Sequence, residues 1–222
     1  MPLSKLYVFD AYGTLFDVHS AVARHAGEIG PEAARLSDLW RTKQLEYTWV
    51  RSLSGRYRDF QALTEEALDY AAARCGGLAP GLRAKLLAAY AVLDAFSDAA
   101  ATLDALRARG AKTAILSNGT PAMLERAVAS AGLGDRLDAI LSVDPLRIYK
   151  TAPAAYEIIE AQLGMAPPQV TFLSSNRWDI AGATAFGLRC IWVNRLGLPD
   201  EYGELAPAAV VKSLDGLLAL DA

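Results

Sequence analysis

A short apolar run that ends on an acid, Leu6 to Phe9 followed by Asp10, constrains the fold of this 222-residue chain more than any other stretch. Four consecutive apolar residues predict a buried strand, and the small residues Gly13 and Thr14 then loosen the backbone into a loop. In a parallel α/β sheet, the C-terminal end of a strand is the usual place for an active-site side chain. A lone Asp could equally begin an exposed turn, so the interpretation depends on what the rest of the chain brings to the same place.

The composition bounds the size and the partners of the protein. A hydrophobic content of 53% is enough for a full core in one domain, or in one domain that carries an insert. The formal charge of -3 and the absence of a basic run argue against a nucleic-acid partner, whose phosphates require a basic face. No apolar run approaches the roughly 18 residues that a membrane span needs, and no signal peptide precedes the first strand. We therefore expect a cytoplasmic protein without a membrane partner.

Cys75 and Cys190 are the two cysteines, and they lie far apart without the spacing of a metal site. We expect free thiols in a reducing compartment.

Strand-like runs disappear between residues 17 and 96, where Ala, Leu, Arg and Glu recur at helical spacing. Ser37 is expected to cap the first helix of this region. His19 and His25, near its start, are interpreted as solvated or capping residues and not as catalytic bases. The pattern predicts a helical bundle with helices at 37–53, 60–74 and 82–93.

Strands and helices alternate from residue 97 onward. Ser97 or Asp98 is expected to cap a helix that ends at Gly110, and the pair Thr120-Pro121 suits the cap and first turn of the next helix. The remaining pattern predicts strands at 111–118, 139–143, 170–173, 190–193 and 210–211, and helices at 153–163, at 178–186 and from 213.

This alternation implies right-handed crossovers and a parallel sheet with helices on both faces. The first strand belongs to the same sheet, so the bundle is an insertion. The sequence therefore predicts an α/β fold: a Rossmann-like core of residues 1–16 and 97–222, with a helical-bundle cap of residues 17–96 inserted after the first strand.

Polar side chains follow the strands of this predicted core, where the carboxyl ends of parallel strands face one crevice. Each of them has an ordinary explanation as a turn, a helix cap or a solvated charge. Because such residues follow four successive strands, we instead expect them to form one functional site. The residues concerned are Asp10, Thr14, Ser117, Asn118, Lys150, Ser174, Ser175, Asn176 and Asp179.

The segments that carry these residues resemble a known family. FDAYGTLFD, WRTKQLEYTW, LSNG, Lys150 and SSNRWD are similar to the L-2-haloacid dehalogenases of the haloacid dehalogenase superfamily. The resemblance covers nearly the whole chain, including the insert, which resembles that family's cap domain. Two departures are Thr42, where Gln is common, and Thr151, where Pro is commoner. They imply a different halide preference or pocket width and a less rigid lysine loop.

Tyr12 separates two activities within this superfamily. Its phosphatases carry a second Asp two residues after the nucleophile, as general acid, and need Mg²⁺ to neutralise the phosphate. Here that position is Tyr12, and Asn176 stands where a further carboxylate would favour a cation. A departing halide needs no proton. We therefore expect a metal-independent dehalogenase without a cofactor, in which Lys150 supplies the fixed positive charge; a small-molecule phosphatase and a catalytically silent relative are the alternatives.

The resemblance implies hydrolysis of short-chain (S)-2-haloacids to (R)-2-hydroxy acids and halide. Asp10 would attack the halogen-bearing carbon and form an aspartyl ester, which water then hydrolyses. The implied catalytic set is Asp10, Thr14, Arg41, Ser117, Lys150, Tyr156, Ser174, Asn176 and Asp179. The implied substrate-binding set is Ala11, Tyr12, Arg41, Leu45, Phe60, Ser117, Asn118 and Trp178.

Within these sets the resemblance implies distinct roles. Arg41 would meet the halide as it becomes an anion, and Asp179 would position or activate water with the help of Asn176 and Ser174. Tyr156 could equally be an ordinary helix aromatic. Serine hydrolase, dinucleotide-binding and P-loop motifs are absent from the sequence. The expected partners are a small 2-haloalkanoic acid and the halide product, and the apolar residues between 40 and 50 permit a homodimer.

Overall fold

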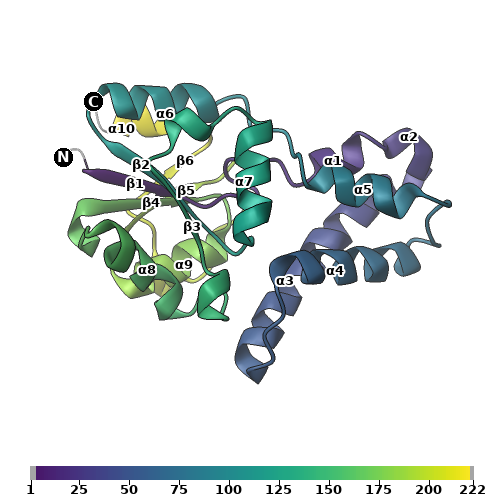
Figure 1. Cartoon of the computed structure of the whole chain (residues 1–222). Helices are drawn as coiled ribbons and strands as arrows, with labels where there is room; N and C mark the ends of the chain where they lie inside the picture. Colours follow the sequence, from purple (N-terminus) through teal and green to yellow (C-terminus); the bar gives the residue numbers. More distant parts are fainter. Residues whose placement is uncertain (1–3, 221–222) are drawn as a thin grey trace.

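The computed structural model describes residues 4–220, and its centre is a six-stranded parallel sheet in the order β3-β2-β1-β4-β5-β6 (Figure 1). β1 lies inside the sheet, where Leu6 is in register with Lys112 of β2 and with Val170 of β4. The predicted α/β class and parallel sheet are confirmed. The strands are β1 (Leu6–Phe9), β2 (Lys112–Ser117), β3 (Ala139–Ser142), β4 (Val170–Ser174), β5 (Arg189–Val193) and β6 (Ala209–Val211).

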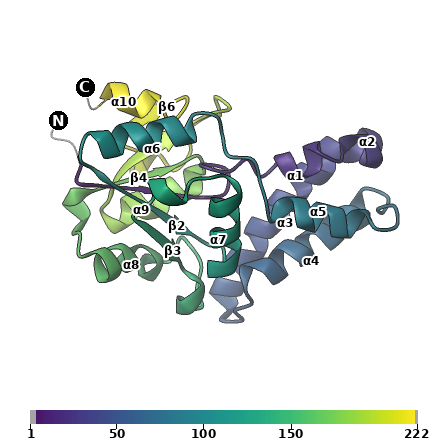
Figure 2. The ribbon, with the colours of Figure 1, turned by 45° about the horizontal axis from the view of Figure 1, so that its top comes forward.

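Helices cover both faces of the sheet. α6 and α10 lie on one face, and α8 and α9 lie on the other (Figures 1 and 2). The helices of this part are α6 (Ala99–Ala108), α7 (Pro121–Ser130), α8 (Pro153–Leu163), α9 (Arg177–Phe186) and α10 (Gly216–Leu220), with 3-10 turns η2 (Gly134–Arg136), η3 (Asp144–Leu146), η4 (Pro167–Gln169) and η5 (Gly203–Leu205).

The ends of these helices follow local sequence signals. Thr120 caps α7 as predicted, because its side chain accepts a hydrogen bond from the Met123 N–H and Pro121 begins the first turn. Gly164 and Gly187 end α8 and α9 in the left-handed conformation that glycine adopts most easily.

The helices between β1 and α6 gather to one side of the sheet (Figure 1) and remain grouped there in the turned view of Figure 2. The two segments that connect them to the sheet run side by side, because Phe16 forms an antiparallel bridge with Ala95. Two backbone hydrogen bonds, from Phe96 to Leu15 at 2.9 Å and from Asp17 to Asp94 at 2.8 Å, reinforce this pairing. The elements are α1 (Ser20–Ala23), α2 (Ala26–Ile29), η1 (Gly30–Glu32), α3 (Ala33–Ser54), α4 (Phe60–Arg74) and α5 (Leu82–Tyr90).

Several predicted helix boundaries are wrong. α3 begins at Ala33, so Ser37 lies inside the helix, where its buried hydroxyl is 2.7 Å from His19 Nδ1 and caps nothing. Asp98 does occupy the N-cap position of α6, but its carboxylate pairs with Arg195 instead of capping. α5 ends at Tyr90 and not at residue 93, α10 begins at Gly216 and not at residue 213, and the short helices α1 and α2 were not expected.

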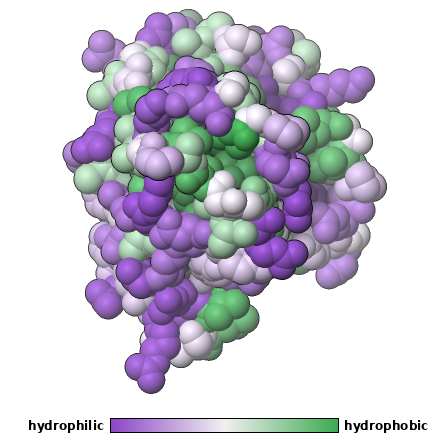
Figure 3. All heavy atoms as spheres, turned by 90° about the vertical axis from the view of Figure 1, so that its right-hand side faces the viewer, coloured by the Kyte–Doolittle hydropathy of each residue, from purple (hydrophilic) through white to green (hydrophobic). Residues whose placement is uncertain are grey.

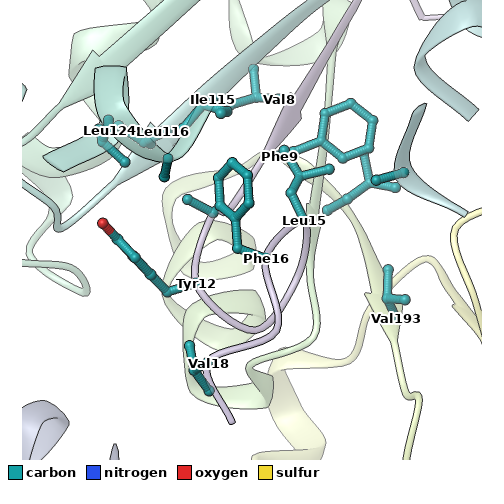
Figure 4. Close-up of a cluster of buried hydrophobic side chains, with 14 of the residues drawn as sticks. Val8, Phe9, Tyr12, Leu15, Phe16, Val18, Ile115, Leu116, Leu124 and Val193 are labelled. Carbon is teal, nitrogen blue, oxygen red and sulfur yellow. The ribbon is translucent and has the colours of Figure 1, made fainter. Parts of the chain in front are cut away.

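The apolar residues around β1 form the centre of the core (Figure 4). Val8 and Phe9 of the strand and Leu15 and Phe16 of the following loop are all completely buried. Because helices cover both faces of the sheet, β1 is apolar on both sides, which explains its continuous rather than alternating pattern. This packing fixes the position of the acid that follows the strand.

The two cysteines and the character of the helices bear on two further predictions from the sequence. Cys75 and Cys190 are both free cysteines, as predicted. Within residues 4–220, none of the helices combines the length and the apolar character that a membrane crossing requires.

Candidate active site

Asp10 stands at the carboxyl end of β1, with only 5% of its surface exposed. Its backbone N–H donates to the Leu173 carbonyl oxygen of β4 at 2.9 Å, which continues the sheet pairing by one residue. Its Oδ2 accepts hydrogen bonds from Asn176 Nδ2 at 2.7 Å, Thr14 Oγ1 at 3.1 Å and Ser174 Oγ at 3.4 Å. Its Oδ1 faces the ammonium group of Lys150 at 3.1 Å.

The two hydroxyl groups beside Asp10 are oriented by the backbone. Thr14 Oγ1 accepts from the Ser175 N–H at 2.8 Å, and Ser174 Oγ accepts from the Asn176 N–H at 3.1 Å. Because these N–H groups occupy an acceptor site on each hydroxyl oxygen, the hydroxyl protons are directed toward the carboxylate. These donors therefore hold the Asp10 carboxyl group in one orientation.

Lys150 is buried between two carboxylates. Its Nζ is 3.1 Å from Asp10 Oδ1 and 2.8 Å from Asp179 Oδ2. Burial alone would lower the pKa of Lys150, but the charges of Asp10 and Asp179 outweigh burial and raise that pKa above its ordinary value. The backbone N–H of Lys150 donates to Asn118 Oδ1 at 3.0 Å, which ties the lysine loop to the end of β2.

Asp179 lies in the first turn of α9 and is completely buried. Tyr156 of α8 donates a hydrogen bond to Asp179 Oδ1 at 2.7 Å, so this tyrosine is part of the site and not only an ordinary helix aromatic. Burial and the neighbouring Asp10 raise the pKa of Asp179 to about 6, although Lys150 acts in the opposite direction. At neutral pH Asp179 is therefore a carboxylate whose proton affinity is well suited to a general base.

Arg41 reaches this edge of the sheet from α3. Its Nη2 donates to the Tyr12 carbonyl oxygen at 3.0 Å and approaches Asn176 Oδ1 at 3.4 Å, while Nη1 donates to Gln44 Oε1 at 2.9 Å. Arg41 also lines a cavity of about 380 Å³, together with residues that follow β1, β4 and β5. The bundle thus contributes one fixed cation to the strand-end cluster.

Aromatic rings form an apolar wall beside these polar groups. The Tyr12 ring packs against Phe60 at 5.6 Å and stacks on Tyr90 at 5.7 Å between ring centroids. Burial raises the pKa of Tyr12 well above its ordinary value, so the phenol stays neutral. The structure brings Tyr12 and Phe60 together, as the substrate-binding set requires.

Ser117 and Asn118 lie buried at the end of β2. Ser117 Oγ accepts the Gly119 N–H at 3.2 Å. Of the backbone N–H groups after Asp10, that of Gly13 already donates to the Phe16 carbonyl oxygen at 2.8 Å. An anion at this place would therefore use the N–H groups of Ala11 and Tyr12, which belong to the predicted set.

Leu45 and Trp178 are the predicted binding residues that the structure joins least closely to Asp10. Trp178 packs edge-on against Trp49, with ring centroids 5.7 Å apart, and lines a surface hollow with Thr151 and Gly182. Leu45 is half-buried on α3, one turn after Arg41. Substrate contact at Leu45 and Trp178 stays a prediction.

Gln44 and Tyr90 also belong to the site, although neither is in the sets predicted from the sequence. Gln44 is buried, holds Arg41 through Oε1, and donates from Nε2 to Thr64 Oγ1 at 2.6 Å and to Tyr90 Oη at 3.0 Å. Its position three residues after Arg41 places the two side chains on the same helix face, which was an available signal. Tyr90 carries no such signal, because its role depends on the packing of α5 against Tyr12.

Among residues 4–220, no group of three or more His, Cys, Asp or Glu side chains is arranged to hold a metal ion. The charge between Asp10 and Asp179 is the ammonium group of Lys150.

A buried carboxylate at a strand end, facing a fixed ammonium group and a second carboxylate, is suited to displacing a leaving group and hydrolysing the resulting ester. The fold and this site define a hydrolase with a Rossmann-like parallel sheet and a carboxylate nucleophile. The chain belongs to the haloacid dehalogenase-like hydrolases, whose family model matches residues 4–187.

Individual relatives agree with this assignment. (S)-2-haloacid dehalogenase 1 of Pseudomonas sp. (strain CBS-3) is 50% identical over 196 residues, which cover 88% of this chain and 86% of the relative. A solved dehalogenase structure superposes with a TM-score of 0.96 at 46% identity, covering 98% of this chain and 96% of the other. The L-2-haloacid dehalogenase of Xanthobacter autotrophicus with chloropropionic acid covalently bound superposes with a TM-score of 0.90 at 38% identity, and 98% of each chain is covered.

Proposed function

We propose that this chain is an (S)-2-haloacid dehalogenase that converts short-chain 2-haloacids and water to (R)-2-hydroxy acids and halide. The observation that carries the proposal is the environment of Asp10: a lysine ammonium faces it, and a neutral, buried tyrosine stands two residues later. A phosphatase would need an acid at that position to protonate its leaving group. The similarity to named (S)-2-haloacid dehalogenases over most of the chain supports the same conclusion.

In the first step, a carboxylate oxygen of Asp10 attacks the halogen-bearing carbon. The new C–O bond forms as the carbon–halogen bond breaks, and the halide leaves with the bonding electron pair. Oδ2 accepts three hydrogen bonds, whereas Oδ1 has the Lys150 ammonium as its partner, so Oδ1 keeps the more available lone pairs. We assign Oδ1 as the nucleophile.

In the second step, water attacks the carbonyl carbon of the Asp10 ester. Asp179 accepts the proton from this water, because its pKa of about 6 leaves it ionised at neutral pH. The bond between the carbonyl carbon and the ester oxygen, which was Asp10 Oδ1, then breaks. That oxygen leaves in the hydroxy acid and takes the proton held by Asp179, while the oxygen of the water completes the regenerated Asp10 carboxylate and the second proton of the water is released to solvent. Tyr156 and Lys150 hold Asp179 for this role.

The substrate carboxylate binds Ser117, Asn118 and the N–H groups of Ala11 and Tyr12 in this proposal. The departing halide binds Arg41, whose guanidinium group stabilises negative charge that develops only in the transition state. The rings of Tyr12 and Phe60 exclude water from the carbon under attack.

We propose that the reaction needs neither a metal nor an organic cofactor. The ammonium group of Lys150 lies between Asp10 and Asp179, where it balances their negative charge. Full activity in excess chelator is the expected result, and a Mg²⁺ requirement would contradict it.

We also propose that residues 17–96 act as a cap domain on a core of residues 1–16 and 97–222. Two observations support this division. The two segments that connect the cap to the core pair with each other at Phe16 and Ala95, and Arg41 enters the site from α3 of the cap. The free thiols Cys75 and Cys190 support a cytoplasmic location.

A homodimer through α3 is part of the proposal. Val50 and Leu53 are exposed on this helix, Leu53 by 90%, and Trp49 lies beside them. Figure 3 shows hydrophobic side chains among hydrophilic ones in its lowest part, where α3 ends in Figure 1. Sedimentation of the wild type and of Leu53→Asp tests this: the variant is expected to be monomeric, and an unchanged mass would exclude this surface.

Halide release from both enantiomers of 2-chloropropionate tests the activity. Release from the (S)-enantiomer, with (R)-lactate as product, is expected. Hydrolysis of phosphate monoesters without halide release would favour the phosphatase, and inactivity toward both substrate classes would favour a catalytically silent relative.

A further inference from the structure

We infer that Gly119 is a specificity-determining residue, because its missing side chain leaves the space that the Tyr12 ring occupies beside the substrate pocket. This inference rests on the proposed function, in which Tyr12 and Phe60 form the apolar wall. A Cβ atom at Gly119 would lie 2.9 Å from Tyr12 Cε2 and 3.2 Å from Tyr12 Oη. Both distances are shorter than an ordinary contact, so either the Gly119 backbone or the Tyr12 ring would have to move.

The Gly119 backbone is held on both sides. Its N–H donates to Ser117 Oγ at 3.2 Å, and its carbonyl oxygen accepts from Ser142 Oγ at 2.6 Å. Ser117 and Ser142 are themselves register partners at the ends of β2 and β3. Any shift of this peptide would break buried hydrogen bonds, which makes it the more costly response.

The Tyr12 ring is therefore the part that moves. Figure 4 shows its hydroxyl end directed toward the β2–α7 side of the core, near Leu124. Leu124 can adjust, since a Cβ at Gly119 would meet only the end of this flexible side chain, Cδ2 at 3.1 Å. The ring also packs against Phe60 and Tyr90, so a ring that a Cβ at Gly119 displaces changes its position relative to both and alters the space beside Phe60.

The backbone conformation of Gly119 does not itself require glycine. Gly119 is not among the glycines with a positive φ, so alanine can adopt the same dihedral angles. The effect of Gly119→Ala thus comes from the contact with Tyr12 and not from backbone strain.

A narrower pocket beside the rings of Tyr12 and Phe60 discriminates between substrates by the length of their carbon chain. One methylene group that a hydrophobic pocket cannot accommodate changes kcat/KM by at least about tenfold. Chloroacetate has no side chain on the reacting carbon, 2-chloropropionate has a methyl group and 2-chlorobutyrate has an ethyl group. Gly119→Ala is therefore expected to lose most activity on 2-chlorobutyrate, less on 2-chloropropionate and least on chloroacetate.

The test measures halide release from chloroacetate, (S)-2-chloropropionate and (S)-2-chlorobutyrate by the wild type, Gly119→Ala and Gly134→Ala. Gly134 is a matched control, because nothing lies within 4 Å of a Cβ at that position and its φ is not positive. The ratio of kcat/KM for chlorobutyrate to that for chloroacetate is expected to fall at least about tenfold in Gly119→Ala. Gly134→Ala is expected to keep the wild-type ratio.

An equal loss on all three acids, or an unchanged ratio, would overturn the inference while leaving the proposed function intact. A wild type that releases halide from none of the acids would overturn both. If Gly119→Ala does not fold, the double variant Tyr12→Leu/Gly119→Ala must fold, since leucine removes the ring that the new methyl group meets. A double variant that also fails to fold would contradict the role of the Tyr12 contact.

Discussion

Lys150 Nζ lies 2.8 Å from Asp179 Oδ2, and both side chains are almost completely removed from solvent. Opposite charges at this distance in a buried site each stabilise the ionised form of the other, because water does not screen them. The pair therefore does more than fill the core: Lys150 lowers the proton affinity of a carboxylate that burial would otherwise neutralise.

Lys150→Met is expected to abolish turnover and to raise the pKa of Asp179 above about 6. The substitution keeps the apolar part of the side chain but removes the charge that opposes the effects of burial and of Asp10. Carboxyl ¹³C chemical shifts followed through a pH titration measure this pKa. Lys85→Met is the control, because Lys85 pairs with Glu28 on the surface and should leave both turnover and the Asp179 titration unchanged.

The value of kcat is expected to be constant near neutral pH and to fall below about pH 6, because Asp179 acts in the second step, after the halide has left. The pKa of Asp179 is raised from its ordinary value of 3.8 to about 6, so the ionised form that accepts a proton is lost as the pH drops through 6. Lys150 has a raised pKa and stays charged through this range. A pH–rate profile checks this, and an acid limb near pH 4 would show that Asp179 does not limit the rate.

Gly182→Ala is expected to lower kcat by about 10²-fold, since small misplacements of catalytic groups have effects of this size. A Cβ atom at Gly182 would lie 2.7 Å from Tyr156 Oη and 2.6 Å from Thr151 Cβ, so it displaces both the tyrosine that holds Asp179 and the loop that carries Lys150. Gly134→Ala is again the control. A larger effect on KM than on kcat would argue against a role in positioning the second carboxylate.

Arg41→Lys is expected to reduce kcat by about 10²- to 10³-fold, as the loss of one transition-state donor does elsewhere. A lysine ammonium cannot reproduce the fork that contacts Gln44, the Tyr12 carbonyl and Asn176 at once. Arg35→Lys, on the same helix but paired with Glu32 at the surface, is expected to have wild-type activity. Steady-state rates of halide release compare the two variants. Equal rates would show that Arg41 does not bind the departing halide.

The sheet, the connectivity and the strand-end cluster could be predicted because they depend on local patterns. An apolar run ending on Asp10 and a Thr120-Pro121 helix start are both readable from neighbouring residues. Ser37 was misjudged for the opposite reason: a serine at the start of an apolar pattern suggests a cap, but its contact with His19 comes from tertiary packing. Asp98 likewise pairs with Arg195, 97 residues away in the chain.

The same limit applies to the site. Asp10, Lys150 and Asp179 were predictable because parallel strands bring their carboxyl ends together. Tyr90 and the space left by Gly119 depend on how α5 and the β2–α7 loop pack against Tyr12, and no spacing in the sequence encodes that contact.

The central claim is that Asp10 forms a covalent ester that water attacks at the carbonyl carbon. A single turnover in H₂¹⁸O, with enzyme in excess over (S)-2-chloropropionate, tests it directly when the peptide that contains Asp10 is analysed by mass spectrometry. The account predicts ¹⁸O in the Asp10 carboxylate and unlabelled lactate. Label found in lactate, with none in Asp10, would contradict it by showing that water attacks the substrate carbon itself.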